Sequence, residues 1–144
     1  MVHPLRTQFV IADAGHARWV VRSEAAESDF VTVDQRQAPL KPRRSPQGAA
    51  FDSSGQRYNI EERSDAAREH RFRFAHEVAD AINAQAAGGG LNRLVIVAPA
   101  RMLSAIRRDL SPQARAKLAG SLAKDLCKTP DHELKGWLQA LERG

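Results

Sequence analysis

The sequence is poor in cysteine and tyrosine, with one of each, and it contains no long apolar run. A single cysteine, Cys127, excludes an intrachain disulfide and a metal cluster built from cysteines. No apolar run approaches the roughly 20 residues that a membrane-spanning helix needs. The N-terminal residues do not join a long apolar core to a small-residue cleavage site, so no signal peptide is predicted. We therefore expect a cytoplasmic protein that does not use a membrane.

The rest of the composition is that of a globular protein. With 144 residues, of which 42% are hydrophobic and 27% charged, the chain predicts a single domain over residues 1–144. The formal net charge of +5 is compatible with an anionic partner.

The central unit of the chain is predicted at residues 91–110. The apolar run Leu94–Ala98 is typical of a parallel strand buried on both faces. Pro99 ends this strand, because proline has no N–H for the ladder. From Ala100 the apolar spacing changes to that of a helix, with one stripe formed by Leu103, Ile106, Arg107 and Leu110.

Three strands are expected before this unit, over Gln8–Ala14, Ala17–Ser23 and Phe30–Asp34. Their short connections predict an antiparallel meander. Ser64 and Asp65 are expected to cap a helix that runs to about Ala86.

After the central unit, Ser111-Pro112 predicts a short helix, residues 119–126 a fifth strand, and Thr129-Pro130 the start of a final helix. Leu134, Trp137, Leu138 and Leu141 form the apolar face of that helix. The order β-β-β-α-β-α-β-α matches the ribonuclease-H-like architecture, an α/β fold with a five-stranded mixed sheet in the order 3-2-1-4-5.

A long basic loop is expected over residues 36–64, where regular patterns disappear. It contains three prolines, and its first part has four basic residues with no acidic residue between them: Arg36, Lys41, Arg43 and Arg44. A second basic cluster surrounds the helix after the central strand, with Arg101, Arg107, Arg108, Arg115 and Lys117 against Asp109 alone. Arginine at this density suits phosphate contact, because its planar fork can bind two phosphate oxygens. A solvated basic surface is the alternative interpretation.

Catalytic and metal-binding patterns are missing. A two-metal nuclease needs several converging carboxylates. Asp13 follows the first expected strand, but the fourth ends in Ala98-Pro99-Ala100, so Asp13 is interpreted as a turn residue. The five histidines have no second ligand at helical spacing, and neither a phosphate-binding loop nor a nucleophile elbow is present. We expect no metal, no cofactor and no enzymatic activity.

Four stretches, in this order, are similar to one known family: IADAGHARWV, FDSSGQRYNIEERSDAAREHRFRFAHEVADAI, LVIVAPARMLSAIRRDL and KDLCKTPDHELKGWL. Together they resemble the bacterial host attachment protein family, named for a role in attachment to host cells. That family in turn looks like the middle domain of archaeal and eukaryotic peptide-chain release factors, which shares the ribonuclease-H-like arrangement.

The second resemblance implies a position for a functional loop. In release factors, the loop between the third strand and the first helix carries a Gly-Gly-Gln that enters the ribosomal peptidyl-transferase centre. The matching stretch here is Ser54-Gly55-Gln56, which has one glycine fewer. The location of the loop is therefore carried over, and its catalysis is not.

We expect a non-enzymatic protein that associates with ribosomal RNA or tRNA. The candidate contacts are Arg36, Lys41, Arg43, Arg44, Arg57, Arg107 and Arg108. The first alternative is a protein–protein adaptor that acts indirectly in attachment. A further alternative is peptidyl-tRNA hydrolysis, with Gln56 positioning water.

Overall fold

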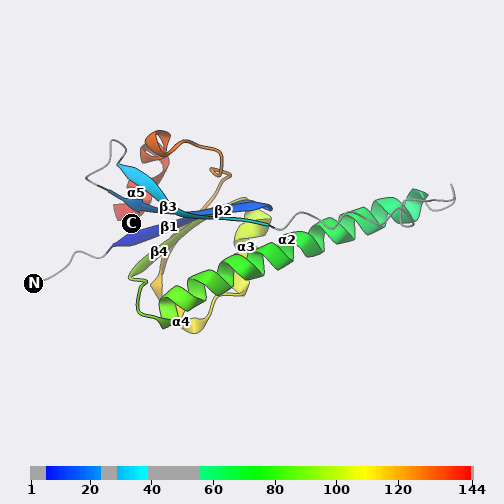
Figure 1. Ribbon diagram of the computed structural model, residues 1–144, viewed down its shortest axis with the longest axis horizontal. Helices are drawn as coiled ribbons and strands as arrows, with labels where there is room; N and C mark the ends of the chain where they lie inside the picture. Colours follow the sequence, from blue (N-terminus) through cyan, green and yellow to red (C-terminus); the bar gives the residue numbers. More distant parts are fainter. Residues whose placement is uncertain (1–5, 24–28, 39–55, 144) are drawn as a thin grey trace, which may run out of the picture.

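The computed structural model describes residues 6–23, 29–38 and 56–143, with backbone alone for 56–67 and 143. Its core is a mixed five-stranded sheet in the order β3-β2-β1-β4-β5 (Figure 1). β1 pairs antiparallel with β2 and parallel with β4, so the two halves of the chain meet at β1. The strands are β1 (Thr7–Ala12), β2 (His16–Arg22), β3 (Phe30–Gln37), β4 (Arg93–Ala98) and β5 (Leu118–Ala123).

Helices cover both faces of this sheet. One face carries the long helix α2 together with α3 and α4, and the other carries the 3₁₀ helix η2 and α5. The bounds are α2 (Gln56–Ala87), α3 (Ala100–Arg108), α4 (Pro112–Lys117), η2 (Asp131–Glu133) and α5 (Lys135–Arg143). We call the two faces the α2 side and the α5 side. The N-terminal part of α2 extends away from the sheet (Figure 1).

Alternate residues of the central strands supply two separate cores. On the α2 side, Ile96 packs in one cluster with Phe74 and Ile106. On the α5 side, Val95 and Val97 pack in another, with Leu134 and Leu138. Successive side chains of a strand point to opposite faces, so a strand buried on both sides must be apolar throughout. The prediction of a doubly buried strand over Leu94–Ala98 is confirmed.

The turn and cap after this strand also follow the prediction. α3 begins directly after Pro99, and the predicted stripe is buried at Leu103, Ile106 and Leu110. Arg107, predicted in the same stripe, is exposed. Ser111 is the N-cap of α4, where its side chain accepts a hydrogen bond from the Ala114 N–H at 3.1 Å. This cap satisfies a backbone donor that the first turn would otherwise leave unpaired.

The predicted loop over residues 36–64 is wrong at both ends. β3 continues to Gln37, which pairs with His16, so Arg36 lies in a strand. α2 begins at Gln56, so Gln56 and Arg57 are helical and Ser64 is an interior helix residue rather than a cap. Residues 56–63 contain neither proline nor glycine and include several good helix formers, which explains why the helix starts earlier.

The C-terminal elements differ from the prediction in three places. β5 ends at Ala123, and Leu126 instead packs in the core of the α5 side. Pro130 precedes η2 without a side-chain cap, and α5 begins only at Lys135. Trp137, predicted on the apolar face of the last helix, is 40% exposed and lies beneath the ammonium group of Lys124.

Candidate functional site

The exposed charges of α2, α3 and α4 are mainly basic. Among their described side chains, two exposed acidic residues, Glu69 and Asp80, stand against seven exposed basic ones. We call these seven residues the basic face: Arg68, Arg73, Arg101, Arg107, Arg108, Arg115 and Lys117.

Arg107 and Arg108, the two predicted RNA contacts on α3, lie in its last turn and are exposed. Their positive charges interact favourably with the partial negative charge of the helix C-terminus. Arg107 forms no ion pair within the described part of the chain, whereas the Arg108 Nε lies 3.9 Å from an Asp109 carboxylate oxygen. Arg115 has a structural role, because its Nη2 donates to the carbonyls of Arg107 at 2.9 Å and Arg108 at 3.3 Å. The guanidinium carbon of Arg108 also lies 5.3 Å from the centre of the Phe72 ring, whereas no such contact holds Arg107 within the described residues.

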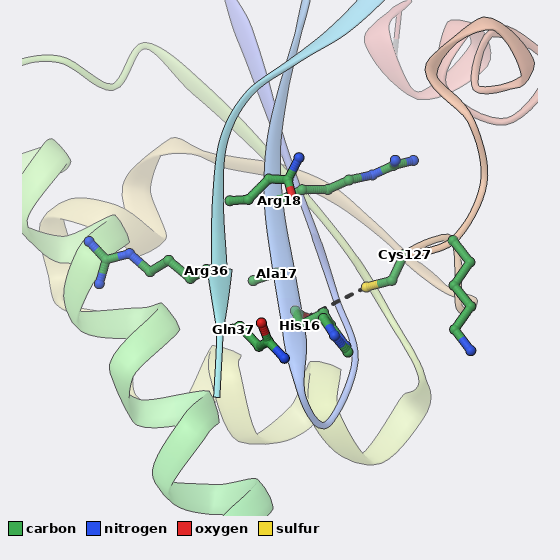
Figure 2. Close-up of a pocket in the computed structure, with 8 residues that line it drawn as sticks. His16, Ala17, Arg18, Arg36, Gln37 and Cys127 are labelled. Carbon is green, nitrogen blue, oxygen red and sulfur yellow. Dashed lines mark hydrogen bonds between the residues drawn. The ribbon is translucent and has the colours of Figure 1, made fainter. Parts of the chain in front are cut away.

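Arg36 is the other predicted contact with a described side chain. Its guanidinium carbon lies 5.7 Å from the centre of the Trp19 ring, and the side chain points toward α2 (Figure 2). It therefore lies on the α2 side, although the sequence places it far from α3. The remaining predicted site residues are not described by side chain: Lys41, Arg43, Arg44, Ser54 and Gly55 lie outside the described residues, and Gln56 and Arg57 are described by backbone alone.

A pocket of about 310 Å³ was not predicted. It lies where β2 begins and β3 ends, beside the segment after β5 (Figure 2). Its lining brings together residues from three distant parts of the sequence: His16, Ala17, Arg18, Gln35, Arg36, Gln37, Cys127 and Lys128. Sequence spacing gives no indication of this grouping, because strand pairing and the path after β5 create it.

Arg18, at the wall of this pocket, connects β2 to the segment before α5. Its Nη2 donates to the carbonyls of Leu126 and Thr129, and its Nη1 lies 3.7 Å from the Asp131 carboxylate. Burial lowers the pKa of Arg18, and the charge of Asp131 partly opposes this shift. Asp131 also accepts hydrogen bonds from the backbone N–H and the hydroxyl of Thr32. Both side chains therefore hold the fold together at this wall.

The thiol of Cys127 is not an activated nucleophile. Its sulfur lies 3.6 Å from the His16 carbonyl oxygen (Figure 2) and 3.7 Å from that of Ile11. Burial raises the pKa of Cys127 to about 12, and the carboxylates of Asp13 and Asp125 add to the shift. The thiol is therefore protonated near neutral pH, and the thiolate is the reactive form.

Asp13, Asp125 and Cys127 have ligand atoms within 4.8 Å of one another, a spacing that could hold a metal ion. Each carboxylate already has a structural partner. Asp13 Oδ1 accepts the N–H groups of Gly15 at 2.8 Å and His16 at 2.6 Å, and Asp125 accepts the Cys127 N–H at 3.2 Å. The interpretation of Asp13 as a turn residue is confirmed.

None of the helices in the described ranges is long and apolar enough to cross a bilayer. In a comparison with known families, the model of the family described as "Protein required for attachment to host cells" matches residues 8–138. The chain belongs to this family. The match extends from β1 into α5, so the whole attachment-family domain includes both sides of the sheet. No curated protein matches the chain significantly.

Proposed function

We propose that this attachment-family protein acts by binding RNA through the basic face. The observation that supports the proposal is the concentration of charge on α3 and α4. Residues 100–117 have a net charge of +4, compared with +5 for the whole chain. The remaining residues sum to +1, although residues 36–44 form a second basic stretch, so an anionic partner is attracted to these two helices.

The exposed arginines have the chemistry that phosphate contact requires. Arg73, Arg101 and Arg107 form no ion pair in the described part of the chain, so their guanidinium groups are available to a phosphate. A guanidinium binds phosphate through two parallel hydrogen bonds, which a lysine cannot do.

The arrangement of elements supports the finer proposal that the domain is ribonuclease-H-like and related to the release-factor middle domain. Three antiparallel strands precede a long helix, and the sheet order is 3-2-1-4-5, as that architecture requires. α2 begins at Gln56, and its N-terminal part extends away from the sheet (Figure 1). On this proposal the partner is ribosomal RNA or tRNA, and the protein is not a hydrolase.

The test is co-sedimentation with bacterial ribosomes, together with RNA binding measured over a range of salt concentrations. The double variant Arg107→Glu, Arg108→Glu should weaken binding at moderate salt by well over tenfold. Each lost phosphate contact should also flatten the plot of log affinity against log salt by roughly 0.7–0.9.

The matched control is Lys124→Glu, Lys128→Glu, which makes the same change in charge at exposed residues toward the α5 side. It should leave the affinity within about twofold if location rather than net charge decides binding. Equal losses in both variants, or no loss in the first, would reject the basic face as an RNA site. Binding to a protein partner that is insensitive to salt would then favour the adaptor function.

A further inference from the structure

We propose that Phe72 is a stacking platform for an unpaired base, so that the basic face selects single-stranded over double-stranded RNA. This inference rests on the proposed function and names the class of RNA. It starts from the position of one aromatic ring on α2.

Phe72 is 36% exposed, whereas Phe74, two residues later on the same helix, is 2% exposed and lies in the core. Phe72 and Trp137 are the exposed aromatic side chains among those that the structure describes. The core of the α2 side is therefore complete without the ring of Phe72. An exposed aromatic ring on a charged helix is a surface on which a planar base can stack.

One arginine lies over the ring of Phe72, and two more lie along the same two helices. The guanidinium carbon of Arg108 lies 5.3 Å from the ring centre. On α2, Arg68 precedes Phe72 by four residues, so these two side chains share a helix face. On α3, Arg101 precedes Arg108 by seven residues, so these two arginines share a face as well. These arginines place positive charge around the ring, where the phosphates on either side of a stacked nucleotide would lie.

Among the described side chains, few acidic groups lie near this position. Asp109 lies 3.9 Å from Arg108 and 3.4 Å from the imidazole of His76, and it is partly buried. Glu69 is the exposed acid closest to Phe72 along α2. Against Arg68, Arg101 and Arg108, the local balance favours an anionic chain.

The combination of ring and arginines distinguishes single strands from duplexes. In a duplex the bases are stacked on each other, so a protein ring on the outside can contact only sugar and phosphate. In a single strand an unstacked base can turn onto the ring while its neighbouring phosphates contact arginine. Without the ring, the arginines would bind single-stranded and duplex RNA alike.

The experiment uses the full chain and two fluorescein-labelled RNAs, a ten-nucleotide single strand and a ten-base-pair duplex, with anisotropy as the readout. The variant Phe72→Ala should lose about 5- to 100-fold in affinity for the single strand, the usual effect of removing one stacking ring. Its affinity for the duplex should change by less than about twofold.

Two further variants separate stacking from packing. Phe72→Leu keeps an apolar side chain on the helix but removes the aromatic ring, and it should lose single-strand affinity as the alanine variant does. Phe72→Trp should retain or increase that affinity. The matched control is Trp137→Ala, which removes the other exposed aromatic under a cation, on the α5 side, and should leave both affinities unchanged.

The outcomes separate this inference from the proposed function. If Phe72→Ala or Phe72→Leu binds the single strand normally while Arg107→Glu, Arg108→Glu does not, stacking is wrong and RNA binding stands. A wild-type preference for the duplex would also overturn the inference. If the wild type binds neither RNA nor ribosomes, both proposals fail.

Discussion

Both sides of the sheet have a buried core, but they use charge differently. On the α5 side, three basic groups are paired with carboxylates: Arg18 with Asp131, Arg22 with Glu142 at 2.7 Å, and Lys135 with Asp29 at 2.9 Å. Lys124, on the same side, lies over the Trp137 ring instead. Among the side chains that the structure describes on the α2 side, seven exposed basic residues stand against two exposed acids.

This difference separates charge that holds the fold together from charge that is available to a partner. The pairs on the α5 side connect α5 and η2 to β2 and to the segment before β3, so these charged side chains hold parts of the fold together. Most side chains of the basic face form no such connection within the described residues. Unpaired like charges close together repel one another, and a bound anion would relieve that repulsion.

The largest expected effects test whether the helices on both sides of the sheet are part of the stable fold. Ile106 and Leu138 are each 0% exposed, one on the α2 side and one on the α5 side. Ile106→Ala and Leu138→Ala should each lower the free energy of unfolding by about 2–5 kcal/mol, measured by urea titration. A negligible loss for Leu138→Ala would show that α5 is not a stable layer, and the comparison between the two sides would fail.

A smaller effect separates a structural from an available arginine. Arg18 has a side chain 12% exposed and donates to two backbone carbonyls, so Arg18→Met should lower the free energy of unfolding by about 1–3 kcal/mol. Arg101→Met, on the basic face, should change it by less than about 0.5 kcal/mol. In RNA binding the ranking should reverse, so that Arg101→Met weakens binding and Arg18→Met does not. If Arg18→Met had the larger effect in both measurements, the division of charge between the two sides would be contradicted.

The smallest effect concerns the exposed pair between Asp29 and Lys135. The hydrogen bond and charge of Lys135 lower the pKa of Asp29, so this pair stabilises the protein above the ordinary carboxyl pKa, and the stabilisation is lost as pH falls. Asp29→Asn should therefore lower Tm slightly at pH 7 and by nothing measurable at about pH 3. If the Tm of Asp29→Asn differed from that of the wild type more at about pH 3 than at pH 7, the pair would not stabilise the fold.

The strand order was predictable because the decisive residues have strong local patterns. Leu94–Ala98 is apolar throughout, and Pro99 marks its end, so the central strand and the helix after it are evident in the sequence. The start of α2 was not predictable in the same way. Residues 56–63 favour a helix but show no apolar stripe, and periodicity is the pattern on which the prediction of helices depends.

The candidate site was predictable as charge but not as geometry. The exposure of Arg108 follows from its place on α3, whereas Arg107 is exposed although its spacing predicted it in the apolar stripe. The position of Phe72 beneath Arg108, and the grouping of His16 with Cys127, depend on how separate elements pack. No spacing within the sequence contains that information.

The parallel pairing of β1 with β4 determines the order in which the chain can fold during its synthesis. β1, β2 and β3 can pair as soon as they have been made, but Phe9 lies opposite Val95, which is synthesised much later. During that interval one edge of β1 is unpaired and apolar, the type of edge that recruits other chains. α2 is synthesised in the same interval and can cover the Val10 face of the strand but not its edge. The nascent protein therefore passes through a stage in which aggregation or a chaperone competes with β4 for the same row of backbone hydrogen-bonding groups.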